Sequence, residues 1–118
     1  MHLKQYPKAI ATQQTQLLEL RRAIRQTRGT IAGKEIDIDK AVVFDDTLKN
    51  EAQRKVKRSE LTGNDVDLLH LLERLDELDD QKEAAEIDLN RLMNQLAIAK
   101  LEKRQTIAQM ETEARLAS

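Results

Sequence analysis

The sequence predicts an all-α protein, an antiparallel helical hairpin in which two long, coiled-coil-like helices are joined by a turn at Thr62–Asp65. Three observations support this fold class. Apolar residues recur every seven positions across residues 3–38, and leucine-class residues recur at coiled-coil spacing across residues 68–110. Between these stretches, Thr-Gly-Asn-Asp has the composition of a helix end followed by a helix start. A short break between two long helices makes them antiparallel neighbours.

The composition fits a single helical domain spanning residues 1–118. Charged residues make up 35% of the chain and aromatic residues only 2%, which leaves little material for a thick core. Such a balance also occurs in disordered chains, but the regular apolar spacing favours helices. The absence of cysteine excludes disulfides and thiolate metal sites. The longest apolar runs, such as 41–44, are far below the roughly 20 residues of a membrane span, so the predicted location is the cytoplasm.

The first helix is predicted over about residues 4–61. Pro7 lies in its first turn, where a missing N–H removes no helical hydrogen bond. A strict seven-residue period favours left-handed supercoiling against a partner helix. The positions of this period are Leu3, Ile10, Leu17, Ile24, Ile31 and Ile38, with Tyr6, Gln13, Leu20, Thr27 and Ala41 at the intervening positions.

The weak part of this helix is the segment 29–47. Gly29 and Gly33 each cost about 1 kcal/mol in a helix interior, and residues 36–44 contain strand-like alternation and β-branched side chains. One alternative continues the helix with a bend or fraying, and the other ends it near Arg28 and inserts a loop or short extended piece. The first is favoured because the seven-residue period continues to Ile38. The two glycines would equally permit close approach of a partner helix.

A further helical stretch is predicted to begin after Asn50, which has the chemistry of an N-cap and is followed by Glu51 and Gln53. The preceding residues 45–47 are a plausible joint. The expected buried positions of this stretch are Leu48, Ala52, Val56 and either Leu61 or Ser59.

The segment Leu48–Lys55, with the sequence LKNEAQRK, resembles a segment found in small uncharacterised coiled-coil proteins of phages and other mobile elements. It covers under a tenth of the chain. The resemblance implies an accessory role beside nucleic-acid machinery, without naming an activity or a functional residue.

The turn predicted at Thr62–Asp65 depends on Gly63, which can adopt the left-handed conformation that closes a helix. Asn64 or Asp65 would then cap the next helix. Folding the chain at Gly63 predicts that the basic residues of 54–58 face the acidic residues of 65–76. The same register brings residues 21–28 near residues 100–104.

The second helix is predicted over about residues 65–116. Its seam is predicted at Leu68, Leu71, Leu75, Leu78, Ala85, Leu89, Leu92, Leu96, Ala99, Ile107 and Met110. Leu69 and Leu72 widen the apolar stripe, which is typical of burial on more than one side. We therefore expect a homo-oligomer, a dimer forming a helix bundle, or a pairing with another helical protein. The predicted oligomer surface consists of Leu68, Leu69, Leu71, Leu72, Leu75 and Leu78.

The charges are segregated although the net charge is only −1. Residues 1–34 hold seven basic and one acidic side chain, and residues 59–90 hold eleven acidic and two basic ones. The predicted partner or nucleic-acid patch consists of Arg21, Arg22, Arg25, Arg28, Lys100, Lys103 and Arg104. Three interpretations remain open: a solvated face, pairing with an acidic segment of a second copy or another protein, and phosphate contact with nucleic acid.

Residues able to perform chemistry are few. His70 lies among leucines without a second convergent ligand, and the acidic residues of 73–86 lack the Glu-x-x-His pairs of di-iron bundles. The sequence contains no phosphate-binding loop and no activated nucleophile. We therefore expect a non-enzymatic interaction or scaffold protein without catalytic, cofactor-binding or metal-binding residues. The alternative is an accessory nucleic-acid-binding protein. Neither a membrane nor a small-molecule substrate is expected as a partner.

Overall fold

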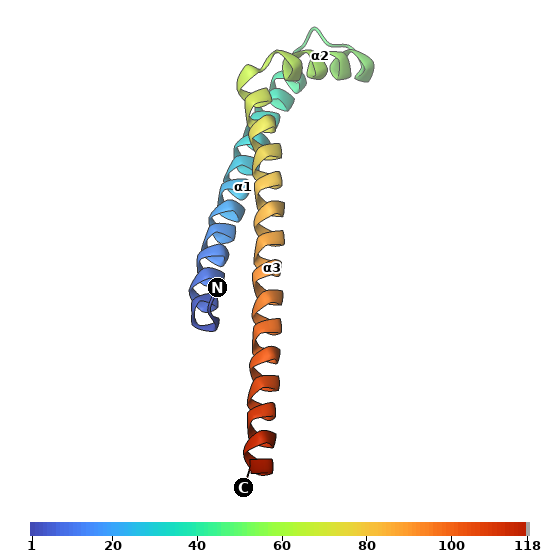
Figure 1. Ribbon diagram of the computed structural model, residues 1–118. Helices are drawn as coiled ribbons and strands as arrows, with labels where there is room; N and C mark the ends of the chain where they lie inside the picture. The colour runs from blue at the N-terminus through green and yellow to red at the C-terminus, as the bar shows by residue number, and fades with distance from the viewer. Residues whose placement is uncertain (118) are drawn as a thin grey trace. The chain divides into compact units, whose positions relative to one another are not determined.

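The computed structural model describes residues 1–117, and within them the regular structure is entirely helical. A short 3₁₀ helix, Leu3–Gln5, precedes three α-helices: α1 (Tyr6–Val43), α2 (Glu51–Asn64) and α3 (Val66–Ala117) (Figure 1). The predicted all-α helical hairpin, with a long first helix and a long last helix, is confirmed.

Helix α1 is continuous through both glycines of the weak segment. Pro7 lies in its first turn, and Gly29 and Gly33 lie in its interior. The alternative that ends the first helix near Arg28 is therefore wrong, and the interruption comes later, at residues 44–50. A Cβ atom added at either glycine would meet nothing within 4 Å. Within residues 1–117, no other helix therefore packs closely against these glycines.

The connection at residues 44–50 is ordered by local side-chain hydrogen bonds. The Asp45 carboxylate accepts a hydrogen bond from the Thr47 N–H at 2.9 Å and a second from the Thr47 hydroxyl. These bonds lower the pKa of Asp45 because they favour its charged form. The predicted joint at residues 45–47 is thus present. The Asn50 side chain accepts from the Gln53 N–H at 2.9 Å, which confirms Asn50 as the N-cap of α2.

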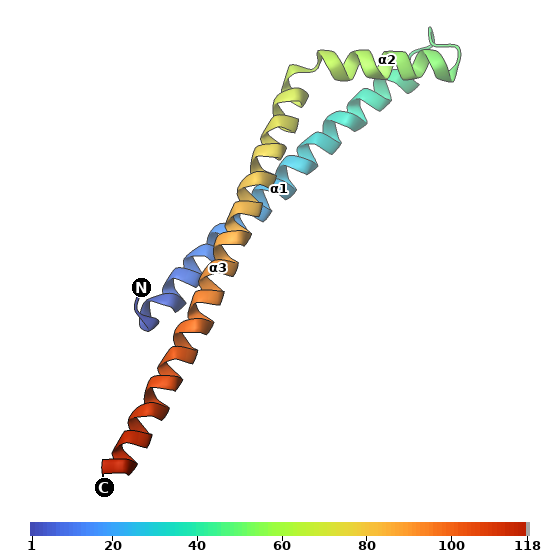
Figure 2. The ribbon, with the colours of Figure 1, turned by 45° about the vertical axis from the view of Figure 1, so that its right-hand side comes forward.

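Helices α2 and α3 are separated by one residue, and they meet at an angle in Figure 2. Gly63 lies inside α2, and no glycine has a positive φ, so the predicted left-handed closure at Gly63 is wrong. The break falls at Asp65, whose φ of −83° and ψ of 94° are extended. The Asp65 carboxylate accepts from the Leu68 N–H at 3.0 Å, which makes Asp65 the cap of α3.

The chain divides into two compact units, and α1 and α3 contribute to both. One unit contains residues 19–82. The other contains residues 1–18 together with the residues from 83 to the end of the described chain. Each unit is described by itself.

The core of unit 19–82 is built from the predicted seam positions of both long helices. Ile31, Ile38 and Leu68 form its centre, and Leu61 from α2 packs against them. The seven-residue period therefore identifies the buried positions of α1 in this unit correctly up to Ile38. Ala41 is exposed and Val42 is fully buried in its place, so the period breaks as α1 ends.

The pairing of chain segments in this unit is antiparallel about the connection 44–50. Ion pairs join α1 to the later segments: Asp39 with Arg58 of α2 at 2.8 Å, Lys34 with Asp65 between α2 and α3 at 3.4 Å, and Arg28 with Asp79 of α3 at 3.9 Å. The closer the α1 residue of a pair lies to the N-terminus, the later in the sequence lies the residue it pairs with. Chain reversal therefore occurs at 44–50.

The predicted register about Gly63 is wrong. Residues 54–58 do not face residues 65–76: Arg58 pairs with Asp39, and Lys57 and Arg54 pair with acids of α2 itself. Likewise, the residues that lie opposite the arginines of α1 are near position 80 of α3, where Arg28 meets Asp79. A seam with a seven-residue period is unchanged when one helix shifts by seven residues along the other, so the period does not specify the register between the helices.

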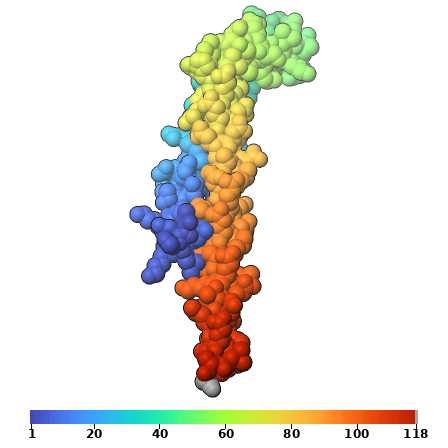
Figure 3. All heavy atoms as spheres, in the orientation of Figure 1, coloured from blue at the N-terminus to red at the C-terminus, as the bar shows by residue number. Residues whose placement is uncertain are grey.

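The other unit pairs the start of the chain with the later part of α3. Tyr6 and Leu17 are buried on α1, and Ala85 is buried on α3. The seam positions of α3 from Leu89 to Ala99 are half-buried, as predicted. All residues of 101–117 are exposed, so the chain itself does not cover the predicted seam positions Ile107 and Met110. Figure 3 shows this red end of α3 extending past the blue start of the chain.

Candidate functional site

The predicted oligomer surface is largely used within the chain. Leu68 and Leu78 are only 1% and 2% exposed, and Leu71 and Leu75 pack against the core of unit 19–82. Of the six leucines, only Leu69 and Leu72 remain exposed. The intrachain hairpin thus covers most of the stripe that was expected to bind a partner, because α1 and Leu61 of α2 already pack on it.

A second apolar face remains open on α2. Val56 is 68% exposed and Ala52 is also exposed, so their predicted burial is wrong. Leu48 and Leu61 are half-buried. Leu48, Ala52 and Val56 recur every four residues and line one shallow surface depression with the side chains of Lys57 and Glu60. This face is amphipathic and lacks a cover within residues 1–117.

The third open face lies at the end of α3, in residues 101–117, which we name the α3 terminal segment. Its large apolar side chains are Leu101, Ile107, Met110 and Leu116, all exposed. Upstream, seam residues alternate at spacings of three and four through Leu96 and Ala99. Continued unchanged, this pattern would reach Thr106, but the apolar residue is Ile107. Ile107 thus lies one residue beyond the position that the unchanged pattern predicts, whereas Met110 lies on that pattern, and the departure falls where intrachain burial ends.

The arginines of the predicted patch lie on α1 in unit 19–82. Arg21, Arg25 and Arg28 surround Ile24, and Lys82 of α3 completes the rim of the same depression. Arg22 is exposed on the same helix. The remaining predicted members, 100, 103 and 104, are exposed residues of α3 in the other unit. The structure thus adds Lys82 as the neighbour of the arginines, which sequence reasoning missed because its register was wrong.

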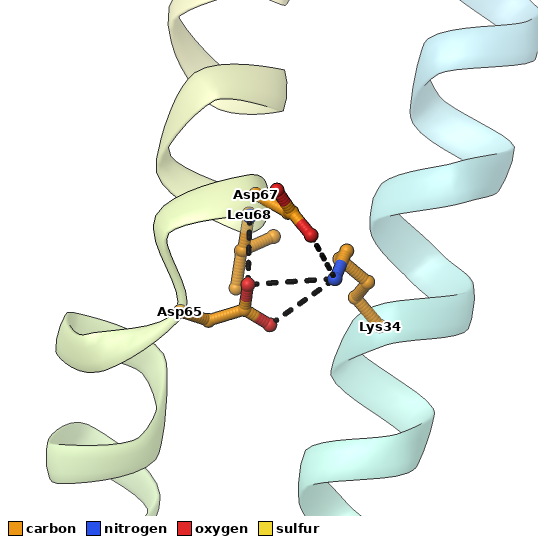
Figure 4. A network of polar contacts seen from close by, with 4 residues as sticks. All are labelled: Lys34, Asp65, Asp67 and Leu68. Carbon is orange, nitrogen blue, oxygen red and sulfur yellow. Dashed lines mark hydrogen bonds and ion pairs between the residues drawn. The ribbon is translucent and has the colours of Figure 1, made fainter.

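One charged cluster was not predicted from the sequence. Lys34 Nζ lies 3.4 Å from both carboxylate oxygens of Asp65 and 3.8 Å from an oxygen of Asp67 (Figure 4). The pKa of Asp65 is lowered, first by the Leu68 N–H that it accepts and then by Lys34, while burial opposes this shift. Position 34 lies seven residues after Thr27 and seven before Ala41, so it belongs to the predicted seam. A lysine at a seam position was the one sequence signal that a cross-helix ion pair lies there.

Groups that could hold a metal ion or perform acid–base chemistry do not converge in the described chain. Within residues 1–117, no three His, Cys, Asp or Glu side chains are placed to share a metal. His70 is exposed on α3, and Glu73, Asp76 and Glu77 beside it are exposed as well. In the same range, no helix has both the length and the apolar character needed to cross a membrane.

Comparisons of the chain with protein-family models, curated proteins and solved structures gave no significant match. The resemblance of Leu48–Lys55 to coiled-coil proteins of phages and mobile elements stays a prediction. The functional interpretation therefore depends on the faces and clusters described above.

Proposed function

We propose that this chain is a non-enzymatic interaction or scaffold protein that binds other helical surfaces through its exposed helical faces. The observation that supports this most directly is the exposure of apolar residues at helical spacing on α2 and on the α3 terminal segment. Val56 is 68% exposed, and Ile107 and Met110 are 46% and 62% exposed. Contiguous apolar faces of this kind mark interaction sites, because water contact with them is unfavourable.

The charges along α3 favour selective binding over indiscriminate adhesion. Acidic residues dominate residues 73–88, whereas the first half of the α3 terminal segment has a small basic excess and the second half a small acidic excess. Charges that flank an apolar helical seam select the partner and its orientation, since like charges oppose a wrong pairing. The scaffold role thus predicts few, specific helical partners.

Affinity capture of the tagged full chain from its native cell tests this function. We would compare the wild type with Val56→Glu and Ile107→Glu, each of which places a charge on one apolar face. Gln105→Glu is the matched control, because Gln105 is exposed on α3 away from the seam. At least one protein captured by the wild type should be lost from one face variant and kept by the control. The proposal fails if no captured protein depends on either face and the chain does not self-associate.

A second candidate function, accessory nucleic-acid binding, is supported by the basic cluster of unit 19–82. Arg21, Arg25, Arg28 and Lys82 surround one depression, a grouping that attracts phosphate. Two observations weaken it: Arg28 pairs with Asp79, and the only aromatic residues available for base stacking are Tyr6, which is buried, and Phe44.

Fluorescence anisotropy with a labelled oligonucleotide tests this second function. Binding should weaken steeply between about 50 and about 200 mM salt, since phosphate contacts release counterions. Arg25→Glu should abolish it, whereas Lys8→Glu, an exposed change of equal charge outside the cluster, should not. No binding at the lower salt concentration would eliminate this candidate.

A further inference from the structure

The α3 terminal segment has a charge order that suits a second copy of itself. Its first half has a basic excess and its second half an acidic excess, since the charged residues in order are Glu102, Lys103, Arg104, Glu111, Glu113 and Arg115. Antiparallel pairing of two copies would place the basic half of each against the acidic half of the other. Parallel pairing in register would instead place like charges together, with Lys103 against Lys103 in the seam.

The apolar residues of the segment fit the same antiparallel arrangement. From Lys103 onward, the seam positions of this arrangement are Lys103, Ile107, Met110 and Ala114, at spacings of four, three and four. In an antiparallel pair centred between Ala108 and Gln109, Ile107 of one copy packs against Met110 of the other. Lys103 then faces the small Ala114, which leaves room for its aliphatic stem to cross the seam.

The flanking charges are complementary in this register. Arg104 directly follows the seam residue Lys103, and Glu111 directly follows the seam residue Met110. Residues at these equivalent flanking positions face each other across an antiparallel coiled coil, so Arg104 of each copy meets Glu111 of the other. By symmetry, the pairing forms twice.

We propose that the α3 terminal segment is a self-association surface, on which a second copy of this chain packs antiparallel about a two-fold axis between Ala108 and Gln109. The inference rests on the proposed interaction function and names one of its partners. It also gives a partner to Ile107, which departs from the upstream seam spacing where intrachain burial ends. The segment is short, about 25 Å at 1.5 Å per residue, so the contact belongs to the small, weak class of interfaces.

Sedimentation equilibrium of the full chain with exchanged charges tests the pairing. Arg104→Glu alone and Glu111→Arg alone should each weaken dimerisation about tenfold or more, because each turns two attractions into repulsions. An equimolar mixture of these two variants should dimerise again, since both cross-pairs become complementary. Gln105→Glu, on the outer face of the same helix, should leave the dissociation constant unchanged.

Spin labels test the orientation directly. The chain contains no cysteine, so Glu102→Cys, Gln109→Cys and Leu116→Cys can each be labelled singly. These positions are seven residues apart and lie on the same side of the helix. Antiparallel pairing predicts a short label–label distance at 109 and, at 102 and 116, labels offset along the axis by about 20 Å from 1.5 Å per residue. Parallel pairing predicts equal distances at all three.

Three outcomes would overturn the inference: a monomer up to about 1 mM, where a dimer with a millimolar dissociation constant would be half-formed; a dimer insensitive to the charge exchange; or equal label distances. A monomer whose Val56 or Ile107 face still captures another protein would refute self-association alone. If the chain neither self-associates nor captures another protein through the Val56 or Ile107 face, the proposed function is refuted as well.

Discussion

Replacing Gly29 and Gly33 with alanine should make the protein more stable. Both residues lie in the interior of α1, are exposed and have right-handed helical backbones. A Cβ at either position meets no atom within 4 Å, so alanine adds helix propensity without a clash. Each substitution should raise the free energy of unfolding by about 1 kcal/mol, and the double variant by about 2 kcal/mol.

Urea unfolding monitored by far-ultraviolet circular dichroism measures this gain. The transition midpoint should rise for each variant without a change in slope, because the surface exposed on unfolding is nearly the same. Ala32→Gly is the matched inverse control, since Ala32 is exposed between the two glycines. It should lower the free energy of unfolding by about 1 kcal/mol.

A loss of stability in Gly29→Ala or Gly33→Ala would refute the reasoning. It would mean that a second helix approaches this face too closely for a methyl group. Such an approach would also make the loss depend on protein concentration. A concentration series therefore separates an unexpected partner from an error in the helix-propensity argument.

Leu68→Ala and Leu69→Ala should differ sharply, because Leu68 is buried against Ile31 and Ile38 whereas Leu69 is 41% exposed. The first should lose about 2–5 kcal/mol in urea unfolding and the second under about 1 kcal/mol; equal losses would place Leu69 in an interface. Asp65 has a lowered pKa, so its charged form stabilises the fold at pH values above its ordinary pKa of 3.8, and this contribution is lost as pH falls through the lower folded value. The difference in melting temperature between wild type and Asp65→Asn, which keeps a capping oxygen, should stay constant above about pH 5 and shrink in more acidic solution; a difference unchanged down to about pH 2 would contradict it.

Much of the fold could be read from local patterns. The seven-residue period identified Leu17, Ile24, Ile31 and Ile38 as buried, and the cap at Asn50 was recognised by its side-chain chemistry. Such features depend on residues within one or two turns of each other. The apolar spacing and the cap chemistry are therefore visible without knowing the register between helices.

The candidate surfaces were harder to predict because they depend on what is already covered. Leu68 and Leu78 were assigned to a partner, yet the chain itself buries them. Val56 was assigned to the core, yet it is exposed. The apolar residues of a stripe are visible in a sequence, but the helix that covers them depends on the register between segments.

By itself, the sequence determined that the chain is helical, which positions of α1 are buried up to Ile38, and that a break lies near Thr62–Asp65. Only the tertiary structure decided the register, with Asp39 against Arg58 and Lys34 against Asp65. The physical reason is that helix periodicity is a local property. Shifting one helix past the other by seven residues keeps every apolar position in the seam. The connection at 44–50 and the cross-helix ion pairs therefore determine which of these registers the chain adopts. That choice also left the end of α3 uncovered.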